Sequence, residues 1–126
     1  MNIAFFEIEQ WEKEYLQQKL GKTHHLFFST HALTKKDIPK IKDVEFLATH
    51  VYSDCSAEIL SQLPKLKYIP TMTTGFDHID LDYCKKKGIV VMNVPTYGEN
   101  TVAEFTFALI LMLTRKMYQS IKRVKE

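Results

Sequence analysis

The chain has 126 residues, of which 45% are hydrophobic and 25% are charged, and its formal net charge at pH 7 is +2. These values fit one folded domain of ordinary size, leave no room for a second, and give no reason to expect nucleic-acid binding. The longest hydrophobic run, 105–113, is interrupted only by Thr106 and is far shorter than the roughly 20 residues that cross a bilayer, so membrane insertion is not expected.

The cysteine content and the N-terminus predict a cytoplasmic protein with reduced thiols. Cys55 and Cys84 lack C-x-x-C spacing and are too few for a disulfide scaffold. The first residues do not have the basic and then apolar plan of a signal peptide.

Short hydrophobic segments alternate with helical ones along residues 1–99. Residues 2–6 read as a strand, and the spacing from Trp11 to Leu20 predicts a helix that ends at Gly21. Further strands are expected at 25–28, 44–48, 66–70 and 89–92, with further helices near 56–63 and 81–87. Five strands that alternate with helices predict an α/β fold: a flavodoxin-like, doubly wound parallel sheet of order 2-1-3-4-5, with helices on both faces.

The last segment, 100–126, is expected to be one long helix that follows the domain 1–99. Thr101-x-x-Glu104 reads as a capping box, and 105–113 has no polar face for more than two turns. Such a helix is expected to be buried on every side, so it calls for another domain or for a homodimer through 102–120.

In parallel α/β sheets, ligands bind beyond the carboxyl ends of the strands. The loops there contain Tyr52, Thr74, Gly75 and Tyr97. Gly75 permits a positive φ, and the amides of Thr74 and Gly75 suit a carboxylate, although a plain turn is the alternative. Tyr52 would face the same cleft, and a packing role is equally open.

Other candidate groups have a structural explanation. Thr101 and Val102 begin the last helix, where free N–H groups suit a cofactor, although a cap is the simpler role of Thr101. Asp77 and Asp80 are expected to turn the chain into the next helix. The five histidines share no ligand spacing with the cysteines, so no metal site is expected.

Three ordered blocks carry a family resemblance: 73–80 (TTGFDHID), 87–95 (KGIVVMNVP) and 100–104 (NTVAE). Together they resemble the NAD-dependent D-2-hydroxyacid dehydrogenases, and Tyr97 is typical of the D-lactate-dehydrogenase-like branch. The resemblance implies hydride transfer between a small 2-oxo acid and a D-2-hydroxy acid. It also implies that the amides of Thr74 and Gly75 hold the substrate carboxylate, that Tyr97 faces the substrate, and that Thr101 and Val102 lie near the nicotinamide.

In this family the three blocks close the substrate-binding domain, and a long helix leads into a Rossmann NAD-binding domain. The four glycines here, at 21, 75, 88 and 98, form no G-x-G-x-x-G, and the family's catalytic arginine, glutamate and histidine lie beyond these blocks. We therefore expect no catalytic residue in this chain, no tight NAD binding and no activity without a Rossmann domain in cis or in trans. Phe105 departs from the histidine that many relatives carry, which concerns packing more than chemistry.

Two other readings remain open. A receiver-like signalling domain has a similar length and fold and would use Asp54 as its phosphoryl acceptor, but the fifth strand is not followed by the required lysine. A non-catalytic module that associates through its last helix is the second alternative. The sequence leaves undecided which 2-hydroxy acid is used and whether the cofactor is NAD or NADP.

Overall fold

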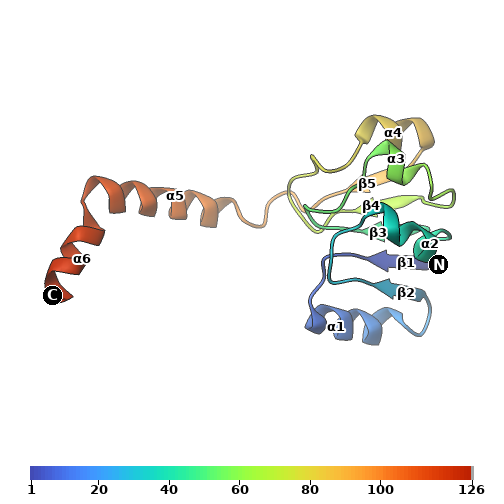
Figure 1. Ribbon diagram of the computed structural model, residues 1–126, viewed down its shortest axis with the longest axis horizontal. Coiled ribbons are helices and arrows are strands. Elements are labelled where there is room, and N and C mark those ends of the chain that lie inside the picture. The colour runs from blue at the N-terminus through green and yellow to red at the C-terminus, as the bar shows by residue number, and fades with distance from the viewer. Residues whose placement is uncertain (126) are drawn as a thin grey trace. The chain divides into compact units, whose positions relative to one another are not determined.

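The computed structural model describes residues 1–125, which form one compact unit over Met1–Pro95 and another that begins at Thr96. The first unit contains five strands (Figure 1): β1 (Asn2–Phe5), β2 (His25–Phe28), β3 (Phe46–Ala48), β4 (Tyr68–Pro70) and β5 (Val90–Met92). All neighbouring strands pair in parallel, in the order β2-β1-β3-β4-β5. The predicted parallel sheet and its strand order are confirmed.

The helices of this unit are α1 (Gln10–Leu20), a 3-10 helix η1 (Lys35–Asp37), α2 (Ile38–Ile41), α3 (Ala57–Leu60) and α4 (Leu81–Lys87). The sequence did not predict η1 and α2, and α3 is shorter than expected. Asp80 caps α4 by accepting a hydrogen bond from the Tyr83 N–H at 2.9 Å, as expected. Gly21 does end α1, but its φ of −65° is right-handed.

Hydrophobic side chains cover both faces of the sheet, because neighbouring residues of a strand point to opposite faces. On one face, the fully buried Leu47 and Ile69 belong to a cluster that α2, α3 and α4 complete, with contributions such as Ile41 and Leu60. On the other face, Ile3, Phe5, Ile8 and Ala48 pack with residues that include Leu16 and Leu20 of α1. This arrangement is the predicted α/β architecture.

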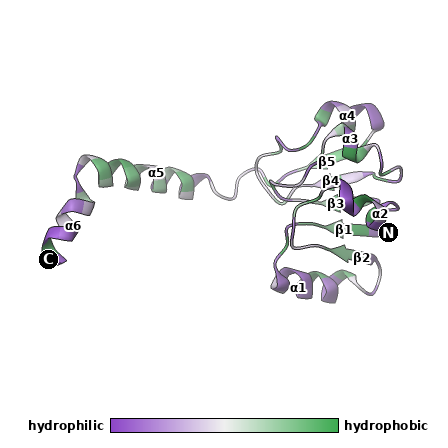
Figure 2. Cartoon of the chain, in the orientation of Figure 1, coloured by the Kyte–Doolittle hydropathy of each residue, from purple (hydrophilic) through white to green (hydrophobic). Residues whose placement is uncertain are grey.

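The second unit contains α5 (Glu99–Thr114) and α6 (Met117–Lys125), and α5 is hydrophobic along most of its length (Figure 2). The expected capping box is wrong: the N-cap of α5 is Gly98, three residues before Thr101, and no side chain caps it. One continuous helix was expected, but Lys116 has a φ of +52° and separates α5 from α6. Taken by themselves, these two helices bury no residue, and no helix within residues 1–125 is both long and apolar enough to span a membrane.

Candidate functional site

Two loops lie side by side at the carboxyl edge of the sheet. One follows β3 and the other follows β4. An isolated parallel bridge pairs Thr49 with Thr71 where the loops begin, and a second bridge pairs Cys55 with Ile79 where they end. The Cys55 N–H also donates to the His78 carbonyl at 3.2 Å. The fold therefore holds Tyr52 in one loop and Thr74 and Gly75 in the other, next to each other at the predicted ligand edge.

All three main-chain carbonyls of the segment 73–75 are occupied. The Thr73 carbonyl accepts the Val94 N–H at 3.0 Å, and the Thr74 carbonyl accepts the Asn93 side-chain amide at 2.8 Å. The Gly75 carbonyl accepts the hydroxyl of Thr73 at 2.6 Å. Within residues 1–125, the N–H groups of Thr74 and Gly75 have no acceptor, and both residues are exposed. Adjacent free amides beside occupied carbonyls form a site suited to an anion.

Gly75 contributes to this site because it has no side chain. Gly75 does not use the positive φ that a glycine permits, because Gly88 is the one glycine with a positive φ in the described chain. A Cβ built at Gly75 would meet only Asp77 Oδ2 within 4 Å, at 3.8 Å. The space in front of this amide is therefore open to a ligand.

Buried polar groups support the loops from below. The Thr71 hydroxyl contacts the Thr73 hydroxyl and donates to the Thr49 carbonyl at 3.3 Å. The Thr49 hydroxyl hydrogen-bonds to His78 Nε2 at 3.3 Å. Burial lowers the pKa of His78, against the opposing charges of Glu7 and Asp77. Because the neutral imidazole is favoured, His78 is a structural partner of Thr49 in this loop.

Tyr52 is held by Glu7, a residue that no sequence motif marks. The side chain of Tyr52 is 84% exposed, and its N–H donates to Glu7 Oε1 at 2.9 Å. Glu7 comes from the carboxyl end of β1, 45 residues away in the chain. Glu7 also lies at a strand carboxyl end, where ligands bind in parallel sheets, but no local motif marks it.

The remaining predicted residues lie in the second unit. Tyr97 is 71% exposed and Val102 is 66% exposed, both near the start of α5. Thr101 lies in the first turn of α5, where N–H groups lack intrahelical acceptors. Asp54, the alternative phosphoryl acceptor, accepts a hydrogen bond from the Ser56 N–H at 3.0 Å.

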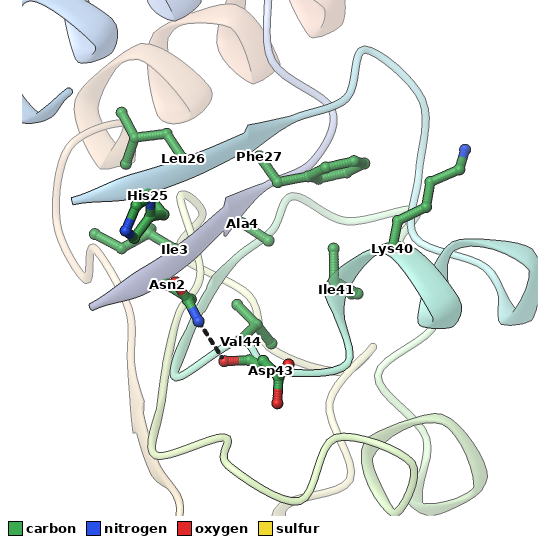
Figure 3. A pocket seen from close by; sticks show the side chains of 10 residues that line it. All are labelled: Asn2, Ile3, Ala4, His25, Leu26, Phe27, Lys40, Ile41, Asp43 and Val44. Atoms are coloured by element: carbon green, nitrogen blue, oxygen red, sulfur yellow. Dashed lines mark hydrogen bonds between the residues drawn. The ribbon is translucent and has the colours of Figure 1, made fainter.

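A separate cavity of about 260 Å³ lies at the opposite, amino-terminal edge of the sheet (Figure 3). Asn2, Ala4, Phe27, Lys40 and Val44 are among its lining residues. The Asn2 side chain donates to the Asp43 carbonyl at 3.1 Å beside it. None of the predicted site residues lines this cavity, so it is not part of the carboxyl-edge site.

Comparisons with known proteins agree with the α/β fold of this domain. Residues 3–124 match the model of the "D-isomer specific 2-hydroxyacid dehydrogenase, catalytic domain" family. A 2-hydroxyacid dehydrogenase homolog of Zymomonas mobilis is 32% identical over the whole chain, and D-lactate dehydrogenase of Escherichia coli is 31% identical. A structure of D-lactate dehydrogenase from Aquifex aeolicus, complexed with NAD and lactic acid, is 40% identical over 98% of this chain, with a TM-score of 0.90.

The chain therefore belongs to the D-isomer specific 2-hydroxyacid dehydrogenase family, as the resemblance implied. It spans 39% of the length of the Zymomonas and Escherichia relatives and 37% of the Aquifex chain. What it matches is their catalytic domain rather than the whole enzyme.

Proposed function

We propose that this chain is the substrate-binding part of an NAD-dependent dehydrogenase that interconverts small 2-oxo acids and D-2-hydroxy acids. The observation that carries the proposal is the pair of free amides at Thr74 and Gly75, beside carbonyls that are all occupied. Two N–H groups of this kind bind a carboxylate without a side-chain charge. The likeness to D-lactate dehydrogenases supports a short substrate such as pyruvate.

Four residues would hold the substrate. The amides of Thr74 and Gly75 bind its carboxylate, and the phenols of Tyr52 and Tyr97 face the rest of the molecule as hydrogen-bond donors or acceptors. NAD, when bound, supplies the hydride chemistry. The chain's own contribution is to orient the 2-oxo acid so that one face of its carbonyl is presented to the cofactor.

Among the described residues, we assign a contact with NAD only to the start of α5. The exposed first turn of α5 offers the N–H groups of Thr101 and Val102, of which Val102 already donates to the Gly98 carbonyl at 2.9 Å. Thr101 is therefore the better candidate for a contact with the nicotinamide amide. Because these 126 residues contain no G-x-G-x-x-G loop, we propose that the cofactor is held by a Rossmann domain in cis or in trans.

Isolated, this chain is proposed to be inactive, because we assign it no proton donor and no cation for the reacting carbonyl. The hydrophobic surface of α5 supports burial against the Rossmann domain or against a second copy of the chain. In either case the assembled protein, and not this domain alone, would carry the activity.

The proposal is tested by amide NMR on this chain with oxamate, an unreactive analogue of pyruvate. Oxamate and acetate are expected to shift the Thr74 and Gly75 resonances, whereas acetamide, which lacks the charge, is not. Gly75→Ala is expected to keep its thermal stability, since only Asp77 lies near the new methyl group, and to lose most of the oxamate response. Shifts spread over the surface, or an unchanged response of Gly75→Ala, would contradict the site.

The activity itself is tested on the product of the complete gene. With pyruvate and NADH, it is expected to oxidise NADH and to form the D-isomer of lactate. A complete product that binds oxamate at Thr74 but never oxidises NADH with any 2-oxo acid would favour a non-catalytic module instead.

A further inference from the structure

Glu7 has an unusual main-chain conformation at the end of β1. Its φ is +60°, in the left-handed region that residues other than glycine rarely adopt. The conformation is held on both sides: the Glu7 N–H donates to the His31 carbonyl at 3.3 Å, and the Ile8 N–H donates to the Ser29 carbonyl at 3.2 Å. The turn after β1 is thus fixed against the segment that follows β2.

The side chain of Glu7 joins this turn to the loop after β3. Its Oε1 accepts the Tyr52 N–H at 2.9 Å, and its Oε2 accepts the hydroxyl of Ser53 at 2.5 Å. Ser53 is only 2% exposed, and its oxygen in turn accepts the Leu33 N–H at 3.0 Å. One carboxylate and one buried hydroxyl therefore tie the ends of three strands together. Hydrogen bonds to a carboxylate are stronger than those between neutral groups.

Tyr52 has no other main-chain anchor among the described residues. His50 and Val51, directly before it, make no main-chain hydrogen bond in residues 1–125. The Tyr52 side chain also lines an open cavity of about 310 Å³, together with Glu7, Thr30 and His50. A tyrosine that is largely exposed beside an open cavity, with its main chain fixed by a carboxylate, is placed to contact a ligand through its phenol.

We propose that Glu7 is a positioning residue of the substrate site: its carboxylate fixes Tyr52 at the edge where the 2-oxo acid is held by Thr74 and Gly75. This inference rests on the proposed function. Glu7 acts through Tyr52 and touches no substrate. Loss of the Glu7 carboxylate therefore lowers the affinity for the 2-oxo acid and leaves the carboxylate site at Thr74 and Gly75 intact.

The test compares Glu7→Gly, Glu7→Asn and Glu7→Gln with the unsubstituted chain. Glycine and asparagine both tolerate the left-handed conformation, so neither is expected to unfold the turn, and neither spans the distance to both Tyr52 and Ser53. Glutamine keeps the length and one acceptor oxygen, and it is the rescue variant. The readouts are hydrogen exchange of the Tyr52 amide and the affinities for oxamate and acetate.

Glu7→Gly and Glu7→Asn are expected to speed exchange of the Tyr52 amide by about tenfold or more and to weaken oxamate binding by about three- to tenfold. Acetate, which occupies only the Thr74 and Gly75 amides, is expected to bind as before, and Glu7→Gln is expected to lie close to the original chain. If oxamate affinity is unchanged in both short variants, the positioning role is overturned. If the unsubstituted chain shows no oxamate response at Thr74 and Gly75, the proposed function itself fails.

Discussion

The hydroxyl of Thr73 donates a hydrogen bond to the carbonyl of Gly75, two residues further along, with an oxygen–oxygen distance of 2.6 Å. Thr73 is 6% exposed, so its side chain is fixed in the core while Gly75 faces solvent. The bond engages the Gly75 carbonyl inside the loop. A carbonyl left free beside the Thr74 and Gly75 amides would repel an anion.

Thr73→Val is expected to destabilise the fold by about 1–2 kcal/mol, because the shape is kept while the hydrogen bond to the Gly75 carbonyl and the polar contact with Thr71 are lost. Oxamate binding is expected to weaken in addition. Denaturant unfolding and an oxamate titration measure the two effects. Thr106→Val is the control, since its hydroxyl donates to the Val102 carbonyl on an exposed helix and its loss is expected to matter little. Equal behaviour of the two variants would refute the role of Thr73.

Substitutions of Gly88 and Gly98 by alanine can be compared to measure the effect of main-chain conformation on stability. A Cβ has no neighbour within 4 Å at either position, but Gly88 has a φ of +70° where it ends α4, and Gly98 does not. Gly88→Ala is expected to cost about 1–2 kcal/mol of unfolding free energy, and Gly98→Ala less than about 1 kcal/mol, because only the N-cap preference for glycine over alanine is lost there. Thermal unfolding measures the difference. A similar shift for both variants would mean that conformation at Gly88 is not the cause.

Asp37 is expected to make stability fall in acid. Burial raises its pKa, but the hydrogen bonds from the Thr34 hydroxyl and N–H and the contact with His31 outweigh burial, so the pKa is lowered. A carboxyl with a lowered pKa stabilises the fold above its unfolded value of about 3.9, and this contribution is lost as pH falls through the folded value.

Asp37→Asn is therefore expected to be less stable than the original chain at neutral pH, by about 1–3 kcal/mol, and the gap is expected to narrow below about pH 4. Denaturant unfolding as a function of pH measures both. Asp82→Asn on the exposed face of α4 serves as the control. A gap that stays constant with pH would show that Asp37 is held by packing rather than by charge.

The sheet could be predicted because each strand is a short run of hydrophobic residues between helical or turn segments. The segment 35–41 was missed for a physical reason: η1 and α2 are each shorter than two helical turns, too short to show a period. Their start depends on the reciprocal hydrogen bonds between Thr34 and Asp37, at a spacing that also reads as a turn. The start of α5 was predicted wrongly because a sequence motif is present that the structure does not use. Thr101 and Glu104 have the letters of a capping box, but the helix already begins at Glu99, with Gly98 as its N-cap.

The site was predictable where main-chain geometry follows from the fold, and not where it depends on distant side chains. Tyr52, Thr74 and Gly75 were selected because parallel strands place their following loops at one edge. Glu7 was not, because its partners Tyr52 and Ser53 lie 45 and 46 residues away and no local pattern records that contact. Single-sequence reasoning identifies a candidate loop at the strand ends more readily than the residue that holds the loop.

The reactivity of the Cys55 and Cys84 thiols reports whether the core beneath the candidate site excludes solvent and reagents. Burial raises the pKa of Cys55 to about 12 and also raises that of Cys84, and both side chains are 1% exposed or less. Since the thiolate is the reactive form, both thiols are expected to react with a disulfide reagent at about pH 8 far more slowly than free cysteine. They should react at the rate at which the chain opens, and immediately in concentrated guanidinium chloride. Rapid release of one equivalent from the native chain would show that the bridge between Cys55 and Ile79 opens easily, which would contradict a preformed carboxylate site at Thr74 and Gly75.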